Sequence, residues 1–141
     1  AGNGHDRVIE LLLQRGAEID VQKSDGVTAL MVAATTGHKQ VVNLLLRHGA
    51  EINKQNSSGD TALIGAAWEG HERVVELLLQ RGADANLQSS IGGAALMGAA
   101  IKGHERVVDV LLRRGAEVNL QKIDDGTALM YAADNGHERV V

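Results

Sequence analysis

The sequence predicts an all-α repeat solenoid, built from helix–turn–helix units that are joined by β-hairpin-like connectors. Three dipeptides support this prediction, because each recurs at an interval of 33 residues. Gly-His begins at residues 4, 37, 70, 103 and 136, Gly-Ala at 16, 49, 82 and 115, and Ala-Ala at 33, 66, 99 and 132. Three pairs in one phase indicate an internal repeat, and a repeat of this length is typical of a stacked array rather than a closed globule.

The repeat divides the chain into one array of units. We assign a partial unit to 1–17, full units to about 18–50, 51–83 and 84–116, and a partial unit to 117–141. Since the end units are incomplete, we expect a piece of a longer array. Neither end has the polar outer face of a terminal repeat, so a sharper alternative is end-to-end self-association through uncapped repeats.

The first helix of each unit is short. In "GDTALIGAAWEG", Thr61 can cap a helix by accepting a backbone N–H, and Gly70 ends the helix. The same pattern in every unit predicts inner helices over about 28–35, 61–68, 94–101 and 127–134. In the unit 84–116 the capping residue is Ala94, preceded by two glycines. Because losing a cap costs about 1 kcal/mol, we expect the softest interior segment there.

The second helix of each unit is amphipathic. In "HERVVELLLQRG", Val74, Val75, Leu78 and Leu79 share one face and charged residues fill the other. This pattern predicts outer helices over about 5–14, 38–47, 71–80 and 104–113. The connector that follows each outer helix lacks helical periodicity. One unit cannot bury its own apolar face, so neighbouring units must cover it.

These residues resemble the ankyrin repeat over the full chain. The turn–Thr–x–Leu start of that family matches "DGVTALMVAA", "SGDTALIGAA" and "DDGTALMYAA", and its second half matches "GHKQVVNLLLRHGAEIN" and "GHERVVELLLQRGADAN". The resemblance implies an L-shaped stack whose connectors project to one side. Inner helices would then line a concave groove, and outer helices would form the convex back. Where the family has a His that bonds to neighbouring backbone, this chain has an apolar residue: Met31, Ile64, Met97 and Met130.

The resemblance also covers a connector asparagine. Asn53, Asn86 and Asn119 match the residue that asparaginyl hydroxylases modify in some ankyrin-repeat proteins, and Asp20 replaces it in the first full connector. We expect the main role of this side chain to be structural, through hydrogen bonds to connector backbone.

Composition excludes several functional classes. The net charge is −4, with 14 basic and 18 acidic residues and no basic run, which disfavours nucleic-acid binding. No apolar run approaches the ~20 residues that span a bilayer, so we expect no membrane insertion. The chain contains no Cys, which excludes disulfides and thiolate metal sites and is compatible with an intracellular, cytoplasmic location.

Motifs for chemistry are also missing. His5, His38, His71, His104 and His137 repeat at one unit's spacing, about 8–10 Å, whereas zinc ligands lie ~2 Å from a single ion. We therefore expect these histidines to be structural, with no bound metal. No serine lies in a nucleophile elbow, and "IGGAAL" lacks the Lys-Ser/Thr of a phosphate loop. The sequence predicts no catalytic residue, no cofactor and no enzymatic activity.

Two columns of positions change in size and charge from unit to unit. The column before each Gly-His contains Thr35, Thr36, Trp68, Glu69, Ile101, Lys102, Asp134 and Asn135. The column at the connector tips includes Asp25, Val27, Ser58, Asp60 and Ile91. Because packing does not determine these residues, they are our candidates for contacts with a partner protein or peptide.

Trp68 is the best single candidate, because it is the only Trp in the chain. In one interpretation it is a partly exposed anchor in the groove, close enough to Ile101 for both to contact one partner, and its removal leaves stability nearly unchanged. In the other it only covers Gly65 and Gly98. Tyr131 either extends the same face or packs between repeats. The leading function is a protein-binding scaffold. The alternatives are a structural spacer or self-stacking rod without a groove ligand, and an array that serves a catalytic or membrane domain elsewhere.

Overall fold

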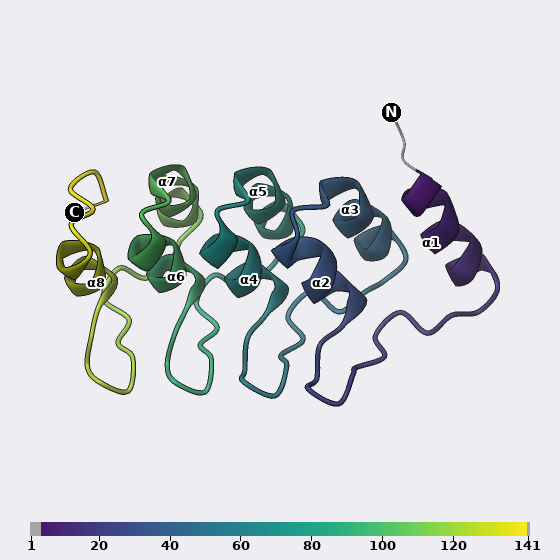
Figure 1. Ribbon diagram of the computed structural model, residues 1–141, viewed down its shortest axis with the longest axis horizontal. Helices are drawn as coiled ribbons and strands as arrows, with labels where there is room; N and C mark the ends of the chain where they lie inside the picture. Colours follow the sequence, from purple (N-terminus) through teal and green to yellow (C-terminus); the bar gives the residue numbers. More distant parts are fainter. Residues whose placement is uncertain (1–3, 141) are drawn as a thin grey trace.

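The computed structural model describes residues 4–140 as two rows of helices, with the connectors projecting to one side (Figure 1). The inner row contains α2 (Ala29–Thr35), α4 (Ala62–Glu69), α6 (Ala95–Lys102) and α8 (Ala128–Asp134). The outer row contains α1 (Gly4–Gln14), α3 (Lys39–Arg47), α5 (Glu72–Gln80) and α7 (Glu105–Arg113). All these bounds lie within two residues of the predicted ranges, so the repeat prediction is confirmed. Residues 1–3 and 141 of the predicted end units lie outside the described residues.

Threonine caps begin three of the inner helices, as the sequence predicted for Thr61. The side chain of Thr61 accepts the Ile64 N–H at 3.2 Å, and Thr28 and Thr127 cap α2 and α8 in the same way. Ala94 keeps the same extended backbone before α6 without a side-chain acceptor. Nearby, Ser89 Oγ accepts the Gly93 N–H at 3.1 Å, which stabilises this connector from within. That the segment is the softest in the interior stays a prediction.

The core lies between the two rows. Each inner helix packs against the inner helices beside it, and α2, α4 and α6 also pack against the outer helix of their own unit. Small side chains permit this close approach, because Ala34, Ala66 and Ala99 of the Ala-Ala pairs are fully buried. Outer helices contribute larger residues such as Leu78 and Leu111, which are also fully buried. The repeated Ala-Ala pair is therefore a packing requirement of the inner row.

The Gly-His pair recurs because its histidine contacts the glycine of the preceding unit. Gly70 has a φ of +79°, and a Cβ placed there would lie 2.6 Å from the His104 ring of the next unit. His104 Nε2 donates to the Trp68 carbonyl at 3.0 Å. The same arrangement joins His71 to Gly37 and the Thr35 carbonyl, and His137 to Gly103 and the Ile101 carbonyl. The structural role predicted for these three histidines is confirmed, and within residues 4–140 no three His, Asp or Glu side chains form a group that could hold a metal.

The connectors are joined to one another by side-chain amides. Gln55 Nε2 donates to Gly59 O at 2.8 Å in its own connector and to Gln88 O at 3.1 Å in the next. Gln22 and Gln88 repeat both bonds. This glutamine ladder was not predicted from the sequence, although Gln recurs there at the same interval.

The connector asparagines also join neighbouring units. Asn53 Oδ1 accepts the Asp84 N–H at 2.9 Å, and Asn86 Oδ1 accepts the Glu117 N–H at 2.8 Å. Asp20, which replaces asparagine in the first full connector, accepts the Glu51 N–H at 3.0 Å. The predicted structural role is thus confirmed for Asn53 and Asn86, and the bonds reach the next unit.

The connectors are hairpin-like without being strands. Each one reverses direction with two backbone hydrogen bonds across the turn, such as Asn56 N–H to Asp60 O at 3.0 Å and Gly59 N–H to Asn56 O at 2.9 Å. Backbone bonds between tips, such as Ser90 N–H to Ser58 O at 2.8 Å, keep adjacent connectors in register. No β-strand is assigned anywhere in residues 4–140, and none of the helices there is long and apolar enough to cross a bilayer.

The contribution of the histidine–glycine contact can be measured with two alanine substitutions. Gly70→Ala and Gly82→Ala both place a Cβ on a left-handed backbone, at φ values of +79° and +93°. Only Gly70 is in contact with a histidine ring, since nothing lies within 4 Å of a Cβ at Gly82. We expect Gly82→Ala to lower the free energy of unfolding by about 1–2 kcal/mol, and Gly70→Ala by about 1–2 kcal/mol more. Urea denaturation measures both, and equal losses would contradict a stabilising role for this contact.

Candidate functional site

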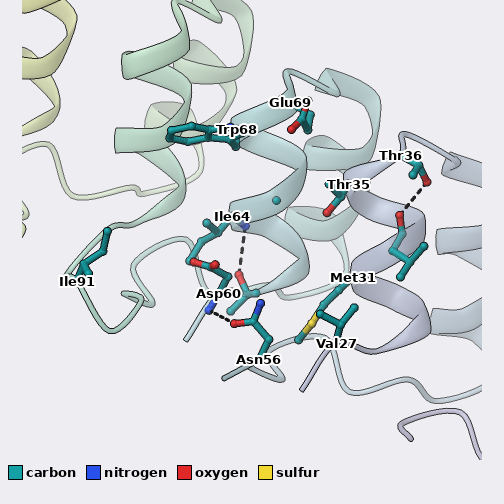
Figure 2. A pocket seen from close by; sticks show the side chains of 13 residues that line it. Val27, Met31, Thr35, Thr36, Asn56, Asp60, Ile64, Trp68, Glu69 and Ile91 are labelled. Atoms are coloured by element: carbon teal, nitrogen blue, oxygen red, sulfur yellow. Dashed lines mark hydrogen bonds between the residues drawn. The ribbon is translucent and has the colours of Figure 1, made fainter. Parts of the chain in front are cut away.

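A groove of about 610 Å³ lies along the inner row, between α2, α4 and the connector side of the array. Figure 2 shows its lining, which comes from two inner helices and from three successive connectors. The lining residues are Val27, Met31, Val32, Thr35, Thr36, Asn56, Asp60, Thr61, Ile64, Gly65, Trp68, Glu69 and Ile91.

Gly65 is one of the residues that line the groove on α4. The residue equivalent to Gly65 of α4 is Val32 in α2, one unit before, and Tyr131 in α8, two units after. A Cβ at Gly65 would collide with the Thr35 hydroxyl of the preceding unit, so the missing side chain lets α2 and α4 approach. Val32 remains 42% exposed at the edge of the hollow. Gly65 therefore permits a close contact between α2 and α4, and both Gly65 and Thr35 line the groove.

Trp68 lies in the last turn of α4, and 40% of it is exposed. Its ring covers Gly98 of α6, where a Cβ would lie 3.3 Å from Cε3. Lys102 Nζ lies over the ring, 5.2 Å from the centroid, within the range of a cation–π interaction. Each interpretation of Trp68 is thus partly correct: the side chain covers Gly98 and is also exposed in the groove. Gly65 is covered by Thr35 instead.

The burial of Trp68 corrects the expectation that removing its side chain leaves stability nearly unchanged. More than half of this residue is buried, so the premise that its removal loses little burial is wrong. At about 25 cal/mol per Å² of apolar surface, we expect Trp68→Ala to cost about 1–3 kcal/mol of stability. Any binding experiment on this variant therefore needs a parallel measurement of folding.

The opposite wall of the groove is aliphatic and is formed by connector residues. Ile91 is 50% exposed at a connector tip, and its carbonyl accepts the Ile123 N–H at 3.1 Å, which holds the tip in place. Val27 and Met31 form the wall at the other end, as Figure 2 shows. Ile64 lies between them on α4. Aliphatic side chains and the Trp68 ring thus enclose the hollow over Gly65.

Two carboxylates complete the lining. Asn56 Oδ1 accepts the N–H groups of Ser58 and Asp60, both at 2.9 Å, and this turn places Asp60 just before α4. Burial raises the pKa of the Asp60 carboxyl, and a hydrogen bond with Asn56 opposes the shift. Glu69 is the last residue of α4 and is exposed. The groove has no basic lining residue, so its polar character is acidic.

The structure brings together about half of the predicted site. Seven candidates line the groove: Val27, Thr35, Thr36, Asp60, Trp68, Glu69 and Ile91. The other candidates lie outside its lining: Asp25, Ser58, Ile101, Lys102, Asp134 and Asn135. Ile101 lies outside this lining, because the groove extends from Trp68 toward α2 rather than toward α6. Partner contacts by any of these residues remain a prediction.

Tyr131 does not extend the groove. Its hydroxyl donates to both carboxylate oxygens of Asp124, at 2.7 and 2.8 Å, and Lys122 Nζ lies 4.8 Å from its ring centroid. The bond to Asp124 raises the pKa of Tyr131 to about 12, and the same bond lowers the pKa of Asp124. Tyr131 is therefore bonded within its own unit, which neither of the two expectations for it included.

Six lining residues were not among the candidates: Met31, Val32, Asn56, Thr61, Ile64 and Gly65. The column that contains Val32, Gly65, Gly98 and Tyr131 varies strongly between units. Applied to this column, the criterion that selected Trp68 also selects Val32 and Gly65. Thr61 is a helix cap, and its place in the lining follows only from the fold.

Comparison with known proteins identifies one family. The family model for ankyrin repeats, in three copies, matches residues 1–89 and again 82–141, which together span the whole chain. Among curated individual proteins, no match was found.

The raised pKa of Asp60 leads to a prediction on pH. The pKa of the Asp60 carboxyl is higher in the folded chain than its ordinary value of 3.8, so the folded chain binds this proton more tightly than the unfolded chain does. Stabilisation by the protonated form is complete below that unfolded value, and it is lost as the pH rises through the folded pKa. We therefore expect the stability of Asp60→Asn relative to wild type to increase as the pH rises from below 3.8 through the folded pKa, and then to level off. Urea denaturation followed by circular dichroism at several pH values measures this difference, and a difference independent of pH would contradict it.

Proposed function

The chain belongs to the ankyrin repeat family, whose arrays are generally protein–protein interaction modules, and we propose that it is a scaffold that binds a protein or peptide in the groove along α2 and α4. Such arrays are typically non-enzymatic. The scaffold therefore acts by presenting a surface, without chemistry and without a cofactor.

The observation that carries the proposal is the position of Trp68. A large aromatic side chain is 40% exposed beside a hollow over Gly65, within a ring of aliphatic and polar residues. Binding hot spots favour Trp in such surroundings, because neighbouring contacts exclude water from the central contact. Contiguous exposed apolar surface on a largely polar protein also marks interaction sites.

The groove is also preorganised. The Trp68 carbonyl accepts a hydrogen bond from His104, and the ring lies on Gly98 and under Lys102. These contacts restrict the side chain before any partner arrives. Binding therefore loses little side-chain entropy at its main anchor.

A spacer or self-stacking rod remains the second candidate. Exposed apolar residues on the outermost described helices favour it, namely Val8 and Leu12 on α1 and Leu129 and Met130 on α8. In that function the groove has no ligand, so Trp68 has no role beyond packing on Gly98. The two functions thus differ in the effect of substituting Trp68.

Trp68→Ala should weaken binding by about 2 kcal/mol or more, equivalent to roughly 30-fold in affinity. The array is immobilised, partners are captured from the source organism, and affinities of wild type and variant are compared by calorimetry. Leu112→Ala is the matched control, because Leu112 is also 40% exposed but lies on the outer helix α7. This control should bind as wild type does.

Leu78→Ala tests the opposite case. Leu78 is fully buried in α5, so its truncation leaves a cavity and should cost about 2–5 kcal/mol of stability. At temperatures where the variant remains folded, its affinity should be unchanged. Captured partners that bind Trp68→Ala and wild type equally would contradict the groove proposal and favour the spacer.

A further inference from the structure

We propose that the groove accepts an extended, basic segment of a partner protein, with an apolar side chain between two Lys or Arg residues. This inference rests on the proposed function and specifies the chemistry of the partner. The apolar side chain fills the hollow over Gly65, and the two cations meet the carboxylates of Asp60 and Glu69.

The charges of the groove support a basic partner. Asp60 and Glu69 are its only ionisable lining residues. Neither forms an ion pair within residues 4–140, where the five salt bridges involve other acids. Lys102 lies over the Trp68 ring and is not part of the lining. Two carboxylates that form no ion pair within these residues, beside apolar surface, complement a segment that is both basic and apolar.

Neither carboxylate is explained by the needs of the fold. Glu69 is in the last turn of α4, where the helix dipole disfavours an anion. The equivalent residues in other units are Thr36, Lys102 and Asn135, so the repeat does not require an acid there. The residues equivalent to Asp60 in the other units are Val27 and two glycines, so the repeat does not require an acid there either. Burial also disfavours the charged form of the Asp60 carboxyl. A bound cation would relieve the cost at both positions.

The spacing of the carboxylates sets the spacing of the cations. Asp60 and Glu69 lie at opposite ends of α4, as Figure 2 shows. The seven steps from Ala62 to Glu69, at 1.5 Å each, correspond to about 10 Å, and the two extended steps from Asp60 to Ala62 add up to about 7 Å, so the two residues lie about 10–17 Å apart. An extended chain covers about 13 Å in four residues, and its side chains at i, i+2 and i+4 point to one face. The expected segment therefore has Lys or Arg at i and i+4, with an aliphatic or Phe side chain at i+2.

Trp68 and the hollow define the central position. The apolar side chain at i+2 lies midway between the cations, in the part of the groove that Gly65 lines on α4. Ile64 and Trp68 flank that space on the same helix. A residue at i+2 thus contacts the anchor while its neighbours at i and i+4 reach the carboxylates.

Three fluorescein-labelled peptide libraries test the inference. All are 11 residues long, lack Trp and Tyr, and carry Leu, Ile, Val, Met or Phe at i+2. Positions i and i+4 are Lys or Arg in the basic library, Gln in the neutral library and Glu in the acidic library. Anisotropy gives the affinity for the whole chain. The emission of Trp68, the only Trp in the chain, reports whether the ring is covered.

We expect the basic library to bind at least 10-fold more tightly than the neutral one at low salt, with a blue shift of Trp68 emission. This advantage should decrease as salt increases, because the cations and carboxylates remain partly exposed. The double variant Asp60→Asn, Glu69→Gln should lose the advantage and keep the affinity for the neutral library. Glu76→Gln is the matched control, since Glu76 is an exposed acid on α5 of the same unit, and it should bind as wild type does.

Each other outcome overturns a defined part of the proposal. If the neutral or acidic library binds as well as the basic one and Trp68→Ala abolishes that binding, the inference is overturned and the groove function remains supported. If basic peptides bind but the double variant has no effect, the inference is likewise overturned. If no library binds, a basic segment is not the ligand, and captured partners with Trp68→Ala decide the groove function independently.

Discussion

The contact of a histidine with the glycine of the preceding unit is the constraint on which the rest of the array depends. Each unit is too thin to bury its own apolar face, so it is stable only when its neighbour is held at a defined distance and angle. The His104 ring fills the space that Gly70 leaves empty and bonds to the Trp68 carbonyl, and it thereby joins the end of α4 to the start of α7. In the connectors, the glutamine ladder and the asparagines Asn53 and Asn86 likewise form hydrogen bonds from one unit to the next. Positions in these ladders barely change between units because a substitution would disturb two units at once.

The candidate site depends on the positions that the ladders leave free. Once packing is secured by Ala-Ala pairs, buried leucines and the histidines, residues on the inner face can vary without loss of register. In α4 this freedom is used for Gly65, Trp68 and Glu69, all of which line the groove. The same contact that joins the units also holds the backbone of Trp68. A rigid scaffold and a variable surface are thus provided by neighbouring residues of one short helix.

Much of the fold was predictable because the same residues recur in every unit. Helix positions followed from glycine, threonine and the apolar face of the outer helices, and all lay within two residues of the structure. The site was only partly predictable. Variation between units selected Trp68, Asp60 and Ile91, which line the groove, and it also selected Ile101, which lies outside the lining. Variation between units does not separate these residues. It indicates that packing does not restrict a position, but it does not indicate which unrestricted positions face one another.

By itself, the sequence determined the repeat, the order of inner and outer helices, and the residues that each unit must keep in order to stack. These properties depend on local periodicity and on contacts between equivalent residues, both of which can be recognised in a linear sequence. Only the tertiary structure decided where the concave face is hollow, which connector tip closes it, and that Trp68 is shared between packing on Gly98 and exposure in the groove. It also showed Tyr131 bonded to Asp124 within its own unit. Such features arise between non-equivalent residues of different units, so their geometry is defined only when the units are stacked.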